Sequence, residues 1–66
     1  MEFKDVLRNL RKEKGVGQIE LANAIGVSKG VISFWETGRN EPTLQALKKL
    51  SKYFGVSIDY LAGLED

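Results

Sequence analysis

The sequence predicts an all-α fold, a compact bundle of five helices in a single domain that covers residues 1–66. Three observations predict it. Apolar residues recur at helical spacing along most of the chain, glycines stand where four of these runs end, and no run alternates as a strand would. A chain of 66 residues buries only a thin core, so one domain is the sensible count.

The first two helices follow from apolar stripes that glycines terminate. We predict the first helix over about Glu2–Lys14, with Gly15 as its C-terminal stop. A second, shorter helix is predicted over about Gln18–Ile25 and ends at Gly26. Its apolar positions are Ile19, Leu21, Ala22 and Ile25.

A third helix is predicted over residues 28–37, with Ser28 as its N-cap and Gly38 as its stop. Its buried face should consist of Ile32 and Trp35, and Val27 should fill the turn before it. The segment 18–38 is therefore a short helix, a tight turn and a second short helix.

Hydroxyl residues mark the start of two more helices. Thr43 follows the breaker Pro42 and caps a helix that ends near Phe54. Ser57 caps a last short helix. The expected apolar stripe of the fourth helix is Leu44, Leu47, Leu50 and Phe54, and the last helix carries Ile58, Tyr60 and Leu61.

Composition excludes several functional classes. The net charge is +1, and the chain has neither Cys nor His. Disulfides, the usual transition-metal ligands and the commonest general base are thereby removed, so we expect no metal, no cofactor, no small-molecule substrate and no enzymatic activity. No apolar stretch suits a membrane span or a signal peptide, and we expect a cytoplasmic protein.

The pair of short helices in residues 18–38 is typical of proteins that lay the second helix in the major groove of DNA. The outward face of helix 28–37 should then contact the bases. Lys29 and Ser33 can donate to base edges or to a phosphate, whereas the exposed apolar residues suit thymine methyl groups. The full predicted set is Lys29, Gly30, Val31, Ser33 and Phe34. For Phe34, folding back over the core is almost as good an interpretation as exposure to the groove or a partner.

Phosphate contacts are expected at the helix starts and in the polar loop after Gly38. The predicted residues are Gln18, Ser28, Thr37, Arg39 and Asn40. Two of these positions have alternatives. The Gln18 amide either bonds a phosphate or braces a residue of the next helix, and Asn40 fits an ordinary polar loop about as well.

A charged residue stands beside a core position on each of two helices that should pack together. Arg11 follows Leu10, and Glu36 follows Trp35. We predict a partly buried ion pair between Arg11 and Glu36, which would fix how helix 28–37 sits on the first helix and would contribute little net stability. The competing interpretation places Arg11 on DNA.

One short helix binds DNA weakly, so we expect a homodimer on a palindromic double-stranded operator, with half-sites about 34 Å apart. The expected dimer interface consists of Leu44, Ile58 and Tyr60, although Tyr60 fits the core equally well. The alternative function is a protein-interaction or antitoxin-like module on the same fold. The near-neutral charge and the apolar Val31 and Phe34 prompt that alternative.

A set of residues along nearly the whole chain carries a resemblance. They are Arg11, Gln18, Glu20-Leu21-Ala22, Gly26-Val27-Ser28, Ile32-Ser33, Trp35-Glu36, Gly38, Glu41-Pro42, Leu47, Leu50 and Phe54-Gly55-Val56-Ser57. With these residues the chain resembles the Cro/repressor-type, or XRE-type, helix-turn-helix family. The resemblance implies a lambda-repressor-like five-helix domain, dimeric sequence-specific DNA binding and control of transcription, with repression as the expected direction. It also implies the Arg11–Glu36 pair and phosphate contacts near Gly17, Thr37 and Arg39.

Three positions depart from the pattern of that family. Gly17 stands where a hydroxyl residue is usual, Gly30 replaces a frequent base reader, and Phe34 replaces a polar or basic residue. Together they predict fewer hydrogen bonds to bases and more reliance on methyl contacts or DNA shape.

Overall fold

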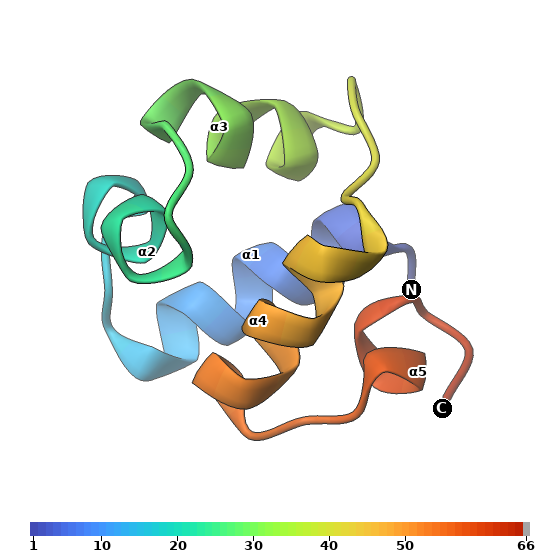
Figure 1. Ribbon diagram of the computed structural model, residues 1–66. Coiled ribbons are helices and arrows are strands. Elements are labelled where there is room, and N and C mark those ends of the chain that lie inside the picture. The colour runs from blue at the N-terminus through green and yellow to red at the C-terminus, as the bar shows by residue number, and fades with distance from the viewer. Residues whose placement is uncertain (66) are drawn as a thin grey trace.

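Five helices and no strand make up residues 1–65, the part of the chain that the computed structural model describes (Figure 1). They are α1 (Phe3–Lys14), α2 (Gln18–Ile25), α3 (Lys29–Thr37), α4 (Leu44–Phe54) and α5 (Ile58–Leu61). The predicted all-α class is confirmed. The first helix begins one residue later than expected, because Glu2 has an extended backbone and is the N-cap. Asp66, the last residue of the predicted domain, lies outside the described part.

The three predicted hydroxyl caps are present. Ser28, Thr43 and Ser57 each accept a hydrogen bond from the backbone N–H three residues further along, at 2.9–3.3 Å. Each cap satisfies a donor that the first turn of a helix leaves unpaired and contributes about 1 kcal/mol. The starts of α3, α4 and α5 are therefore set by local sequence.

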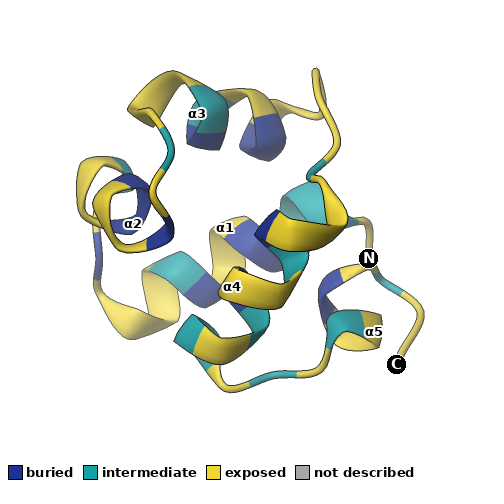
Figure 2. Cartoon of the chain, viewed as in Figure 1, coloured by how far each residue is buried: buried dark blue, intermediate teal, exposed yellow. Residues whose placement is uncertain are grey.

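The core draws one completely buried side chain from each of the five helices. These are Leu7, Leu21, Ile32, Leu50 and Leu61, in order from α1 to α5. Figure 2 shows the buried residues on the sides of the helices that face one another, so that α3 is buried below and exposed above. Trp35 adds an edge-to-face contact with Phe3, at 6.1 Å between ring centroids, which joins α3 to α1.

Two residues of the predicted apolar stripes lie outside the core. Ile19 in α2 and Leu44 in α4 are each 62 % exposed. Each lies roughly a third of a turn from the centre of the buried stripe of its own helix. In α4 the side chain of Ala46 is buried instead. Apolar residues at the first turn of a helix can fit a spacing pattern and still lie off the face that packing covers.

No helix within residues 1–65 is both long and apolar enough to cross a membrane.

The two ends of the described chain lie against each other (Figure 1). Gly63 has a left-handed backbone, with φ +81°, and its Cα faces the first residues of the chain. A Cβ built at this position would collide with the carbonyl oxygen of Met1 and would contact Glu2. Gly63 therefore permits the segment after α5 to close over the start of α1.

We expect Gly63→Ala to lower the free energy of unfolding more than Gly55→Ala does. Gly55 also has a left-handed backbone, at φ +69°, but a Cβ there meets nothing within 4 Å. Gly55→Ala should therefore cost only the left-handed penalty of about 1 kcal/mol. Urea unfolding of both variants measures the difference, and equal losses would show that the contact between the chain ends contributes nothing.

Candidate nucleic-acid interface

Helix α3 presents one face to the molecule and the other to solvent. Ile32, Trp35 and Glu36 form its buried face against α1 and α2. In its first turn, Lys29 and Gly30 are exposed. The turn between α2 and α3 is short, and Figure 1 shows α3 along the outer edge of the bundle. The geometry thus leaves a whole helix side open along its length.

The predicted base-contacting residues do not all lie equally far out. Ser33 is half-buried, and Phe34 is 38 % exposed. Val31, which the sequence placed on the outward face, is half-buried and packs against the hydrophobic core. The correction has a simple cause: Val31 lies beside Ile32 and Trp35 around the helix, so its side chain reaches the edge of the buried face. Because Gly30, Val31 and Phe34 have no polar side-chain atom, Lys29 and Ser33 are the side-chain hydrogen-bond donors of the predicted base-contacting set.

The structure brings the predicted charge pair together. Arg11 Nε donates to Glu36 Oε2 at 2.7 Å, and Arg11 Nη2 donates to Glu36 Oε1 at 3.1 Å. The third guanidinium nitrogen, Nη1, donates to the carbonyl oxygen of Val16 at 3.1 Å. The Glu36 side chain is only 5 % exposed and that of Arg11 15 %. This bidentate ion pair, which is largely shielded from water, fixes α3 against α1.

Gln18 belongs to the same network. Its Nε2 donates to Glu36 Oε1 at 3.1 Å. Of the two roles predicted for this amide, the structure therefore shows the bond that braces a residue of the next helix. The Glu36 carboxylate thus receives donors from both α1 and α2. Its hydrogen bond with Arg11 raises the pKa of the guanidinium above its ordinary value. Because that pKa is raised, the arginine charge would be lost only as the pH rises through a strongly alkaline range.

We expect Glu36→Gln to lower the free energy of unfolding by about 2 kcal/mol, because it leaves a shielded arginine without its anion. The control is Asp5→Asn. Asp5 pairs with Arg8 at 3.9 Å, and both of those side chains are more than a third exposed. Chemical denaturation should show no measurable change for the control, since water screens that pair. Equal effects of the two substitutions would contradict the importance of the Arg11–Glu36 pair.

The remaining predicted phosphate contacts lie at the two ends of α3 and at the start of α2. Gly17 is the N-cap of α2 and supplies backbone only. The Ser28 hydroxyl already accepts the capping bond of α3. Thr37 Oγ1 donates back to the carbonyls of Ser33 and Phe34, at 3.0 and 3.3 Å. Arg39 and Asn40 are exposed in the loop that follows.

Lys4 is a cation near this loop that sequence reasoning missed. A Cβ built at Gly38 would lie 3.3 Å from Lys4 Cδ and 3.9 Å from Lys4 Nζ. The lysine of α1 therefore runs beside the C-terminal end of α3. No pattern in the sequence separates Lys4 from the other bases of α1, because its position depends on how α1 crosses α3.

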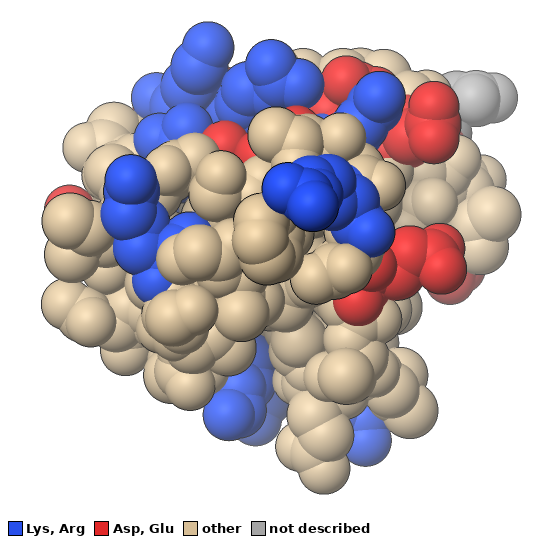
Figure 3. Space-filling view, turned by 90° about the horizontal axis from the view of Figure 1, so that it is seen from above, with Lys and Arg blue, Asp and Glu red and all other residues tan. Residues whose placement is uncertain are grey.

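Charge is unevenly distributed around α3. Figure 3 views the molecule from the α3 side and shows Lys and Arg spread over and around this face, while most of the visible Asp and Glu atoms gather toward one edge. A molecule with a net charge of +1 can thus present a mainly basic face. Such a face attracts a polyanion.

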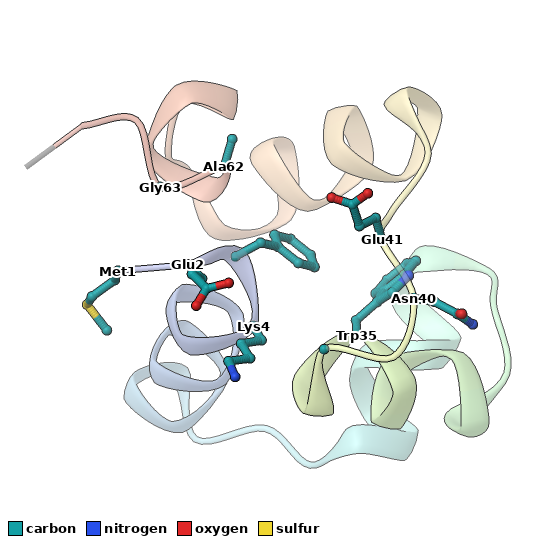
Figure 4. A pocket seen from close by; sticks show the side chains of 10 residues that line it. Met1, Glu2, Lys4, Trp35, Asn40, Glu41, Ala62 and Gly63 are labelled. Carbon is teal, nitrogen blue, oxygen red and sulfur yellow. The ribbon is translucent and has the colours of Figure 1, made fainter.

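A pocket lies on the flank of the site, between the start of α1, the loop after α3 and the segment after α5 (Figure 4). It is lined by Met1, Glu2, Phe3, Lys4, Trp35, Gly38, Asn40, Glu41, Ala62 and Gly63. Two carboxylates in this wall, Glu2 and Glu41, disfavour phosphate there. The surface suited to DNA is therefore the outer side of α3 and not this pocket.

The three residues predicted for a dimer interface lie near α4 and α5 but face different surfaces. Leu44 is strongly exposed at the start of α4. Ile58 is half-buried and lines a groove with Lys48 and Lys52 of α4. Tyr60 is 37 % exposed and lines a separate groove with Met1.

Comparisons with known proteins agree on one family. The model of the family described as "Helix-turn-helix" matches residues 7–61. The HTH-type transcriptional activator BcrR of Enterococcus faecalis is 42 % identical over 66 residues, which is 100 % of this chain and 32 % of that protein. The cryptic phage CTXphi transcriptional repressor RstR of Vibrio cholerae is 41 % identical over 85 % of this chain and 50 % of its own. The chain thus spans about a third to a half of these curated relatives.

Among solved structures, the chain is similar to the P22 c2 repressor protein in complex with synthetic operator 9T. The TM-score is 0.92 and the identity 34 %, and the match covers 98 % of both chains. The likeness therefore includes all five helices and the placement of the outer helix.

Proposed function

We propose that this chain, which belongs to the helix-turn-helix family, is a sequence-specific DNA-binding transcriptional regulator that lays α3 in the major groove. The open outer side of α3 carries the proposal. Its basic surroundings supply attraction to phosphates, and a similar fold is known on operator DNA in the P22 c2 repressor.

The proposed contacts divide into bases and phosphates. Base edges would be met by the outward positions of α3, with Lys29 and Ser33 as hydrogen-bond donors. Gly30 would permit close approach, and Val31 would add apolar contact. Phosphates would be held by Gly17, Ser28, Thr37, Arg39 and Asn40, and by the second amide hydrogen of Gln18, which the bond to Glu36 does not use. The Lys4 ammonium would add positive charge beside the loop.

We further propose repression as the direction of control. Two of the three relatives described above are named repressors, including the one matched over nearly its whole length.

The family and its relatives are regulators, so this chain is proposed to act by binding and not by catalysis. Because the proposed partner is DNA and the named relatives include bacterial proteins, the proposed location is the cytoplasm.

The proposed assembly is a homodimer on a palindromic operator. A single α3 of 9 residues offers few base contacts, and two copies related by a twofold axis would double them. The exposed Leu44, the half-buried Ile58 and the partly exposed Tyr60 are the proposed interface residues. Two-fold docking would place the half-sites about 34 Å apart.

Binding of the chain to a labelled random-sequence duplex, followed by fluorescence anisotropy at salt concentrations from about 50 to about 200 mM, tests the DNA-binding part of the proposal. We expect the logarithm of the binding constant to fall linearly with the logarithm of salt concentration, because phosphate contacts release counterions. Arg39→Ala, which removes a proposed phosphate contact, should weaken binding and reduce the slope by about one for each bound protomer.

Lys14→Ala is the matched control, because it removes the same charge from the end of α1, where the Lys14 ammonium lies 4.9 Å from the centroid of the Tyr53 ring of α4. It should leave affinity and slope nearly unchanged. Affinity that does not respond to salt, or equal losses in the two variants, would contradict the proposed use of α3.

A further inference from the structure

Phe34 and Arg39 form a cation–π pair at the C-terminal end of α3. The Arg39 guanidinium carbon lies 4.8 Å from the centroid of the Phe34 ring, well within cation–π range. Phe34 is 38 % exposed, so the ring is not a core residue that happens to touch a loop. Phe34 thus offers a platform, and Arg39 occupies it.

The backbone makes this cation–π contact possible. Gly38 ends α3 in a left-handed conformation, with φ +80°, and turns the chain back on the last helical turn. The Arg39 N–H then donates to the Phe34 carbonyl at 2.9 Å, and the Asn40 N–H approaches the same oxygen at 3.4 Å. Phe34 therefore holds Arg39 twice, by its carbonyl and by its ring.

The Arg39 guanidinium has no carboxylate partner in residues 1–65. The two ion pairs of this part join Arg8 to Asp5 and Arg11 to Glu36. A contact between a guanidinium and an aromatic ring uses none of the N–H donors of the guanidinium, so these stay available for bidentate bonding to a phosphate. Arg39 is a positioned cation with its hydrogen-bonding capacity unspent.

We propose that Phe34 is a positioning residue that holds the Arg39 guanidinium ready to bind a DNA phosphate beside α3. This inference rests on the proposed DNA-binding function. A guanidinium fixed before binding loses less conformational freedom on reaching the phosphate, and affinity rises accordingly. Phe34 would thus affect DNA binding by positioning Arg39 and not by contacting a base.

The test is a double-mutant cycle of Phe34→Leu and Arg39→Ala, measured by anisotropy on a random-sequence duplex. Leucine keeps apolar bulk but offers no π-face. Phe34→Leu should weaken binding about threefold for each bound protomer, the size of an exposed cation–π contact. Arg39→Ala should weaken it more, and adding Phe34→Leu to Arg39→Ala should cost nothing further. Phe34→Tyr, which keeps the ring, should restore binding.

A matched control and a spectroscopic readout accompany the cycle. Ile19→Ala removes another exposed apolar side chain, from α2, and its effect should simply add to that of Arg39→Ala. In the free protein the Arg39 side-chain proton resonances should be shifted by the ring current of Phe34, and Phe34→Leu should abolish the shift. Thermal unfolding of each variant verifies that it is folded.

Two results would overturn the inference. A cost of Phe34→Leu that persists in the Arg39→Ala background would mean that the ring contacts DNA directly, and no cost in either background would mean that it does neither. Binding by the wild-type chain with zero coupling rejects only this inference. If the wild-type chain binds no DNA at any salt concentration, the proposed function falls as well.

Discussion

The placement of α3 depends on one buried carboxylate. Glu36 takes two hydrogen bonds from Arg11 of α1 and one from Gln18 of α2, and its side chain is almost completely shielded from water. Burying a charged carboxylate carries a desolvation penalty, and the ion pair offsets much of that penalty only while every hydrogen-bond donor is in place. The network therefore specifies the geometry of three helices more than it adds to stability. A helix that must match a groove needs that fixed orientation.

The face that this network holds outward is poor in hydrogen-bond donors. Lys29 and Ser33 are the donors of its predicted base-contacting set, Gly30 has no side chain, and Val31 is partly withdrawn into the core. Selectivity under the proposed function would then draw on a few donors, on methyl contacts and on DNA shape. Most of the binding affinity would then come from phosphate contacts, for which the basic surroundings of α3 and a positioned Arg39 are suited.

Local sequence was sufficient for the helices, since caps such as Ser28 and stops such as Gly38 act within a few residues of themselves. The Arg11–Glu36 pair could be predicted because each charge adjoins a core position. Ile19 and Leu44 could not be placed from spacing alone, because their exposure depends on where neighbouring helices cover the first turn. The contact of Arg39 with the Phe34 ring also could not be predicted from the sequence. It depends on the direction in which the chain leaves Gly38, and that direction exists only in the folded loop.

Selection of duplexes from a random pool by the purified chain tests the central claim most directly, that the outer side of α3 reads DNA. The sequences retained after several rounds should converge on two inverted half-sites whose centres lie about 34 Å, or one helical turn, apart. Lys29→Ala should change the base preferred at one position within each half-site while leaving their spacing intact. A retained pool with no common sequence, or one whose preferred bases do not respond to Lys29→Ala, would contradict the account.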